Sequence, residues 1–320
     1  MDASKVDADD NIPDEVSTVE ELHEMLRRYA LRGGWQRQID AEHWASFVRR
    51  GPTLLVTFES VADTLARPGG LPLGIDFVED KGWSLLHIVA EGETGFRSSA
   101  MFDFLDALSE DETLQAYERT VFYGAGLGGY AACAFSVILP GARVVAFAPR
   151  ATLDPRRAPW DTRDRALRRR DVSGRYADAP ALVEGAMQVF VLYDPHVALD
   201  AMHAGLFPAC NTTLLACPFC GPQPQVVLRQ IDILHALVEQ AAQERLDSSS
   251  FFRHFRSRRQ SGTYLRNLLL ALDGRDKPLM TARLCRYVLE RRRAPAFRKR
   301  LAAANEALAA RGLAPMGPQD

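Results

Sequence analysis

Residues 121–132 read VFYGAGLGGYAA, an apolar run followed by four closely spaced glycines. The apolar residues before Gly124 predict a buried strand, and the small residues after Gly126 predict a helix. Glycines between a strand and a helix permit a sharp turn and close packing of the two elements. The turn leaves free amides at the start of the helix, where the helix dipole favours an anion or developing negative charge.

Similar apolar runs flank this stretch and alternate with amphipathic segments. They are residues 53–59, 84–91, 120–126, 143–149, 188–195 and 212–218. Strands of this kind with helices between them indicate a mostly parallel sheet that is covered on both faces. Helices are also expected over residues 40–50 and 223–243. The predicted fold class is α/β, with an all-helical appendage at the C-terminus.

Three regions follow from composition. Residues 1–16 are acidic and polar and are expected to form a disordered leader; residues 17–246 form the α/β domain, and residues 247–320 an Arg-rich helical segment. The last region contains several amphipathic helices without a fixed period, which argues against a helical repeat. Residues 154–180 are rich in arginine and predict a surface flap.

Composition also restricts location and partners. The 320 residues carry a formal net charge of -2, so no broad positive field for nucleic acid is expected. The N-terminus lacks the features of a secretory signal, and no run approaches the roughly 20 apolar residues that span a bilayer. We therefore expect a cytoplasmic protein with reduced cysteines, no membrane span and no nucleic-acid partner.

The glycines also match a dinucleotide-binding motif. Gly124, Gly126 and Gly129 fit G-x-G-x-x-G, which would bind the pyrophosphate of NAD(P) or FAD. The following strand ends in Pro149 and Arg150 without the carboxylate that binds the ribose, and two strands precede the motif. A nucleotide-dependent oxidoreductase is kept as the alternative function.

The same stretch resembles the nucleophile elbow of the α/β-hydrolase superfamily, which commonly runs Y-G-x-S-x-G-G-Y-A-A. The resemblance covers residues 53–243 and places Gly126 where the family has its serine. It implies that the family's acid falls on Asp194 and that its histidine belongs within residues 217–223, where none is present. Without nucleophile and base, ordinary serine-hydrolase turnover is not expected.

A second resemblance covers most of the chain. FYGAG and GYAA, together with APRATLDPR and the Arg-rich C-terminal helices, are similar to alphaproteobacterial proteins often labelled phosphoadenosine phosphosulfate reductase. That label implies an S-G-G-x-D nucleotide loop and a C-terminal cysteine motif. The sequence contains neither.

The superfamily resemblance implies a ligand site around the turn. Ser60 and the Leu127 amide would form an anion hole, with Arg150 as counter-charge. His196 and His203 follow Asp194, and either could serve as a displaced base that Asp194 orients. The predicted ligand-binding residues are Gly124, Gly126, Leu127, Gly128, Gly129, Ser60 and Arg150, with Asp194, His196 and His203 as the predicted catalytic residues.

Cys217 and Cys220 form a C-x-x-C pair between a strand and a helix, a setting that suits redox thiols. With Cys210 and either His196 or His203 they could also bind zinc, but the spacing matches no known site, so no metal is expected. Buried structural cysteines are the further alternative.

These observations predict an α/β-hydrolase-like protein with a degenerate elbow. We expect it to bind a small anionic or glycan-related molecule, or a protein partner, while the sequence leaves any cofactor unknown.

Overall fold

The computed structural model of the protein describes residues 15–208 and 210–317. The predicted leader therefore lies outside the described residues except at its end. Val16 is buried, and its amide donates a hydrogen bond to the Gly69 carbonyl (3.0 Å). The first helix begins after Thr18, whose side chain forms a capping box with Glu21.

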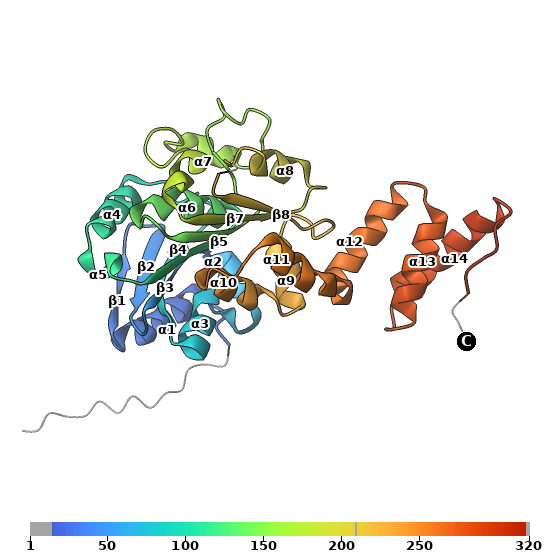
Figure 1. Cartoon of the computed structure of the whole chain (residues 1–320), viewed down its shortest axis with the longest axis horizontal. Helices are drawn as coiled ribbons and strands as arrows, with labels where there is room; N and C mark the ends of the chain where they lie inside the picture. The colour runs from blue at the N-terminus through green and yellow to red at the C-terminus, as the bar shows by residue number, and fades with distance from the viewer. Residues whose placement is uncertain (1–14, 209, 318–320) are drawn as a thin grey trace, which may run out of the picture.

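A mixed sheet of eight strands forms the centre of the molecule, in the order β1-β2-β4-β3-β5-β6-β7-β8 (Figure 1). Strands β1 and β2 are antiparallel, β2 is antiparallel to β4, and the remaining pairs are parallel. The strands are β1 (Gly34–Gln38), β2 (His43–Val48), β3 (Thr53–Ser60), β4 (Ser84–Ala90), β5 (Arg119–Ala125), β6 (Arg143–Phe147), β7 (Gln188–Tyr193) and β8 (Thr212–Ala216).

Helices cover both faces of the sheet, and each face has its own apolar core. The first layer contains α4 (Ser99–Ser109), α5 (Glu112–Gln115), α6 (Leu127–Phe135), α7 (Ala179–Leu182) and α8 (Ala198–Ala204). The second contains α1 (Val19–Leu31), α3 (Leu73–Lys81), α9 (Pro224–Gln230), α10 (Leu234–Ala242) and α11 (Ser248–Phe255). The short α2 (Val61–Leu65) follows β3 directly. The predicted α/β class is thus confirmed, with all six predicted strands present.

Two predicted helices differ from the structure. Residues 40–50, expected to be helical, contain β2, because this segment pairs with β1 and β4 and buries Ala45, Phe47 and Val48 in the cores on the two faces of the sheet. The expected helix over 223–243 is divided into α9 and α10, and Asp232 between them has a φ of 55°. A non-glycine residue in this left-handed region does not continue a helix.

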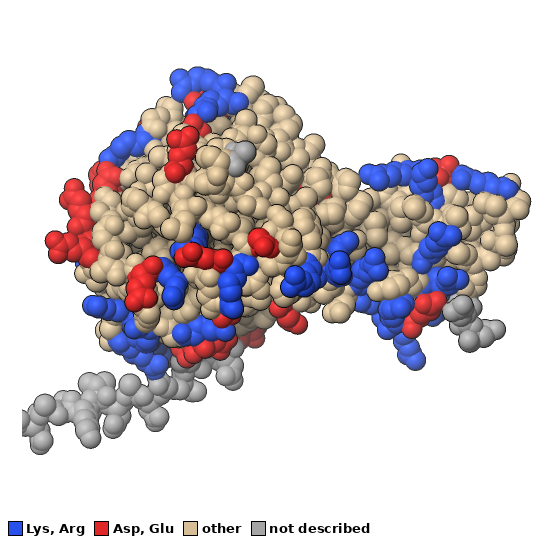
Figure 2. All heavy atoms as spheres, in the orientation of Figure 1, with Lys and Arg blue, Asp and Glu red and all other residues tan. Residues whose placement is uncertain are grey.

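The C-terminal helices α12 (Gly262–Asp273), α13 (Pro278–Leu289) and α14 (Pro295–Ala309) extend away from the sheet (Figure 1). Tyr264, Leu265 and Leu269 of α12 join the apolar core of the second layer. The Asn267 side chain donates a hydrogen bond to the Phe219 carbonyl (3.1 Å). Figure 2 shows Lys and Arg side chains gathered on this part of the molecule. Among the described residues, no helix is both long and apolar enough to cross a membrane.

Candidate functional site at the glycine elbow

The turn between β5 and α6 has the geometry of a strained elbow. Gly126 has φ 57° and ψ −116°, a conformation that side-chain-bearing residues rarely adopt, and its amide donates to the Phe147 carbonyl (2.8 Å). A Cβ atom on Gly124 would lie 2.1 Å from the Gly128 carbonyl oxygen, and one on Gly128 would lie 2.1 Å from the Phe58 carbonyl oxygen. These two glycines are therefore required by close packing.

Gly126 itself is in a different situation. A Cβ atom built on it would meet nothing within 4 Å, so a side chain at this position would point into open space. The strain at Gly126 belongs to the backbone alone, and the turn could accept a serine at a modest cost in stability.

The open space in front of Gly126 is a cavity of about 450 Å³, here called the elbow cavity. It lies at the carboxyl ends of the parallel strands, where ligands of open α/β sheets bind. Its apolar lining includes Phe96, Leu127 and Pro222. Its polar lining consists of Ser60, Asp63, Glu93, Thr94, Arg150, Arg163, Asp164, Gln223 and Gln225.

The elbow cavity brings together many of the ligand-binding residues predicted from the sequence. Ser60, Gly126, Leu127, Gly128 and Arg150 line it. Leu127 is the first residue of α6, and within the described chain its amide has no acceptor. Ser60 caps α2, and its hydroxyl accepts from the Asp63 amide and donates to the Asp63 carboxylate. Gly124 and Gly129, by contrast, serve the packing behind the turn and are not part of the lining.

Asp194 follows β7 and is only 2% exposed. Its carboxylate accepts hydrogen bonds from the backbone amides of Gly221 (2.7 Å) and His196 (2.9 Å). Both partners are backbone amides, so Asp194 holds the loop after β8 against the loop after β7. Among the residues that the structure describes, no histidine ring is bound to this carboxylate.

The two candidate bases lie elsewhere. His196 is exposed, and its ring stacks on Phe219 with centroids 4.2 Å apart. His203 is fully buried; its Nδ1 accepts from the Ala151 amide (3.1 Å), which leaves Nε2–H to donate to Asp161 (2.8 Å). Burial lowers the pKa of His203 despite Asp161. His203 thus fastens the start of the flap to α8 and does not contact Asp194.

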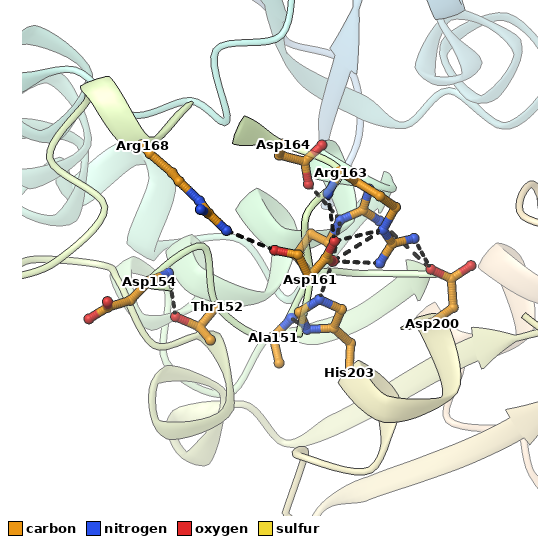
Figure 3. A network of polar contacts seen from close by, with 10 residues as sticks. Ala151, Thr152, Asp154, Asp161, Arg163, Asp164, Arg168, Asp200 and His203 are labelled. Carbon is orange, nitrogen blue, oxygen red and sulfur yellow. Dashed lines mark hydrogen bonds and ion pairs between the residues drawn. The ribbon is translucent and has the colours of Figure 1, made fainter. Parts of the chain in front are cut away.

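Arg150 was predicted as a counter-charge for an anion, but it lies within a cluster of carboxylates. Figure 3 shows these carboxylates, Asp161, Asp164 and Asp200, close to Arg163. The Arg150 guanidinium is 2.8 Å from Asp164, 3.6 Å from Asp161 and 3.8 Å from Asp200. The neighbouring Arg163 binds both Asp161 (2.7 Å) and Asp200 (2.5 Å). Three carboxylates surround two guanidinium groups, so this part of the cavity carries no surplus positive charge. The flap folds onto the body through these pairs.

Cys217 and Cys220 are free thiols buried in the core beneath the loop after β8. Burial raises the pKa of Cys217 well above its usual value, and a hydrogen bond with Cys220 adds to the effect. A thiolate is disfavoured there, so the pair lacks the electropositive, accessible setting of redox cysteines. Cys210 is exposed. The described ranges contain no group of three or more His, Cys, Asp or Glu residues that could hold a metal ion.

One polar network was missed at the sequence level. The His43 Nδ1–H donates to the Asp40 carboxylate (2.8 Å), and His43 Nε2 accepts from the Thr94 hydroxyl (2.7 Å). The Thr94 hydroxyl also accepts from the Phe96 amide (3.0 Å), and Thr94 is only 2% exposed. The groups are those of a hydrolase relay. Their burial indicates a structural role, since they fix the loop after β4 that forms one wall of the elbow cavity.

That network escaped prediction because the segment containing Asp40 and His43 was expected to be a helix.

The flap is fixed in a similar way by a buried arginine. The Arg97 guanidinium donates to the carbonyls of Asp171, Ser173 and Arg175 at 2.7–3.0 Å. It also donates to the Tyr130 hydroxyl (3.2 Å).

Comparisons with known proteins concern the fold alone. No protein-family model matches the sequence, and neither does any curated protein. Among solved structures, acylaminoacyl peptidase from Pyrococcus horikoshii is 10% identical, with a TM-score of 0.46, over 68% of this chain and 43% of the peptidase. Est1E from Butyrivibrio proteoclasticus is 11% identical, with a TM-score of 0.40, over 69% of this chain and 98% of its own.

The capsule O-acetyltransferase of Neisseria meningitidis serogroup A is also similar, at 11% identity and a TM-score of 0.38, over 56% of this chain and 85% of the enzyme. These neighbours give no support to the phosphoadenosine phosphosulfate reductase label. The sheet order also differs from the 3-2-1-4-5-6 order of a Rossmann domain. The strand order and the strand–turn–helix unit at Gly126 agree with the mostly parallel, hydrolase-like sheet that was expected from the sequence.

Proposed function

We propose that this chain is a binding protein on an α/β-hydrolase fold, which holds a glycan-related, polyhydroxylated small molecule in the elbow cavity without hydrolysing it. The observation that carries the proposal is the combination at Gly126 of an elbow turn, an open cavity and no side chain. The site keeps the shape that presents a nucleophile and lacks the nucleophile.

The bonding of Asp194 supports the same conclusion. In a Ser-His-Asp relay the acid orients a histidine. Here both carboxylate oxygens are bound by backbone amides, and the facing loop offers Gly221 in place of a ring. The acid position has therefore become a structural anchor between two loops.

The polar lining favours a sugar-like ligand among those expected from the sequence. Asp63, Glu93 and Asp164 supply carboxylates that accept hydrogen bonds from hydroxyl groups, and Gln223 and Gln225 supply amides that donate and accept. Both arginines of the lining are already ion-paired. Phe96 and Leu127 add apolar surface for the carbon face of a sugar ring. A simple anion would instead meet a surplus of carboxylates.

A thermal-shift panel of neutral mono- and disaccharides, with and without O-acetyl groups, tests the proposal. A ligand bound by the native state raises its stability by mass action, by about 2.7 kcal/mol at a concentration of 100 Kd. We expect at least one sugar to stabilise the protein, and less so in Glu93→Ala and Gln223→Ala. Glu110→Ala, outside the cavity, is the matched control. Ester turnover that Asp194→Ala abolishes would overturn the proposal.

A further inference from the structure

A second cavity of about 270 Å³ adjoins the elbow cavity. It lies between α2 and α9, over the carboxyl ends of β3 and β5, and is here called the arginine cavity. Asp63, Ala125, Gln223 and Gln225 line both cavities. Its own lining includes two arginines, Arg67 and Arg229, that belong to no recognisable sequence motif.

Arg229 on α9 carries a charge without a direct partner. Its guanidinium forms no hydrogen bond or ion pair with any described residue, although the side chain is half-buried. Burial and the neighbouring charge of Arg67 lower the pKa of Arg229. A half-buried guanidinium beside a second one is unfavourable unless an anion compensates it.

The guanidinium of Arg67 has partners for only some of its N–H groups. Its terminal nitrogens lie 3.2 Å from Asp76 and 3.7 Å from Glu59, while its Nε is buried without a hydrogen-bond partner. The buried Oε1 of Gln225 also has no partner within the described structure. The hydroxyl of Tyr123, another lining residue, forms no hydrogen bond there either. Several polar groups without hydrogen-bond partners among the described residues therefore line the arginine cavity.

The carboxylates nearby do not cancel this surplus of donors. Glu59 is buried, and burial raises its pKa, which favours its neutral form. Asp76 is shared between Arg67 and His235 (2.8 Å). Asp63 lies at the boundary with the elbow cavity and accepts from Ser60. Arg229 is left as the guanidinium that none of these three carboxylates contacts.

We propose that the arginine cavity binds an oxyanion, a carboxylate or phosphate group, between Arg67 and Arg229. The fork of donors on a guanidinium matches both groups. Because the two cavities share four lining residues, one ligand can occupy both, with its hydroxyl-rich body at the elbow. Only this last step rests on the proposed function: the ligand is then an acidic or phosphorylated sugar.

Calorimetric titration of the full chain with inorganic phosphate and with acetate, at constant ionic strength against chloride, tests the anion site. We expect binding of at least one anion, weakened roughly tenfold or more in Arg229→Gln, because a hydrogen bond to a charged group is lost. Arg259→Gln removes the same charge from an exposed arginine outside the cavity and should bind as the unaltered protein does. Whichever of phosphate and acetate binds more tightly identifies the oxyanion group of the ligand.

Two results would overturn the anion site. One is the absence of phosphate and acetate binding by the unaltered protein; the other is equal binding by Arg229→Gln and Arg259→Gln. Neutral sugars separate this inference from the proposed function. If they fail to bind while phosphate or acetate binding depends on Arg229, the anion site stands and the proposed function falls. If neutral sugars bind and the Arg229→Gln change leaves anion binding unaltered, the proposed function stands and the anion site falls.

Discussion

The buried carboxylate of Asp194 accepts a 2.7 Å hydrogen bond from the backbone amide of Gly221. In a serine hydrolase an acid at this place would orient a histidine. The contact joins the loop after β7 to the loop after β8, and Pro222 and Gln223 of the latter line the elbow cavity. The carboxylate therefore supports the backbone of these two loops.

Removing that carboxylate should therefore affect folding. Asp194→Ala leaves the amides of Gly221 and His196 without their acceptor, and we expect a loss of about 2–4 kcal/mol in the free energy of unfolding. Urea unfolding followed by circular dichroism measures it. Asp111→Ala, which removes an exposed helix cap, should cost only about 1 kcal/mol. Equal losses would argue against the anchoring role.

Gly126→Ser should fold and remain inactive as an esterase. Its Cβ meets no atom within 4 Å, so the cost is that of the sparsely populated backbone conformation, about 1–3 kcal/mol. Gly128→Ser is the matched control, because its Cβ would lie 2.1 Å from the Phe58 carbonyl oxygen and should cost roughly 3 kcal/mol or more. Thermal unfolding and a chromogenic acetate ester test both expectations. Rapid turnover by Gly126→Ser would reveal a general base that we have not identified.

The protein should lose stability as the pH falls below about 6.5. Burial lowers the pKa of His43, His87 and His203 in the folded state, to about 3 for His87. Below the unfolded pKa of about 6.5 the unfolded chain binds protons that these folded histidines reject. Each such histidine then lowers the free energy of unfolding by about 1.4 kcal/mol per pH unit, until the pH reaches the pKa of that histidine in the folded state.

Denaturant unfolding at pH 7.5, 6.5, 5.5 and 4.5 measures this slope. His87→Leu should flatten it, because burial lowers the pKa of His87 to about 3 and its Nε2 has no partner within the described residues. His196→Leu changes an exposed ring and should leave the slope unchanged. A free energy of unfolding that is constant from pH 7.5 to 4.5 would contradict the prediction.

Arg97 should control the mobility of the flap. Arg97→Met removes hydrogen bonds to the carbonyls of Asp171, Ser173 and Arg175, so amides of residues 171–175 should exchange with deuterium faster. Exchange followed by mass spectrometry measures the effect. Arg119→Met, an exposed arginine at the start of β5, provides the control. Unchanged exchange in Arg97→Met would show that the ion pairs around Asp161 fix the flap without it.

The cysteines should differ sharply in reactivity. Exposed Cys210 should react with iodoacetamide in the native protein, while Cys217 and Cys220 should react only after unfolding. Peptide mass mapping with and without urea measures the order. Fast native labelling of Cys217 would favour the redox alternative.

The sequence by itself determined the features that depend on neighbouring residues. The apolar runs predicted β3 to β8, and the glycine spacing located the turn at Gly126. Both features are visible in the local sequence, because a buried strand requires consecutive apolar residues and a positive φ favours glycine. It did not predict β2, whose pairing with β4 is a contact between distant segments.

The tertiary structure alone decided the partners of the site residues. Arg150 follows β6 as an isolated cation in the sequence, yet the flap and α8 bring three carboxylates to it. Arg67 and Arg229 lie in distant segments and become neighbours across one cavity. Local conformational preference is a property of a few adjacent residues, whereas ion pairing and burial depend on which distant segments the sheet order brings together.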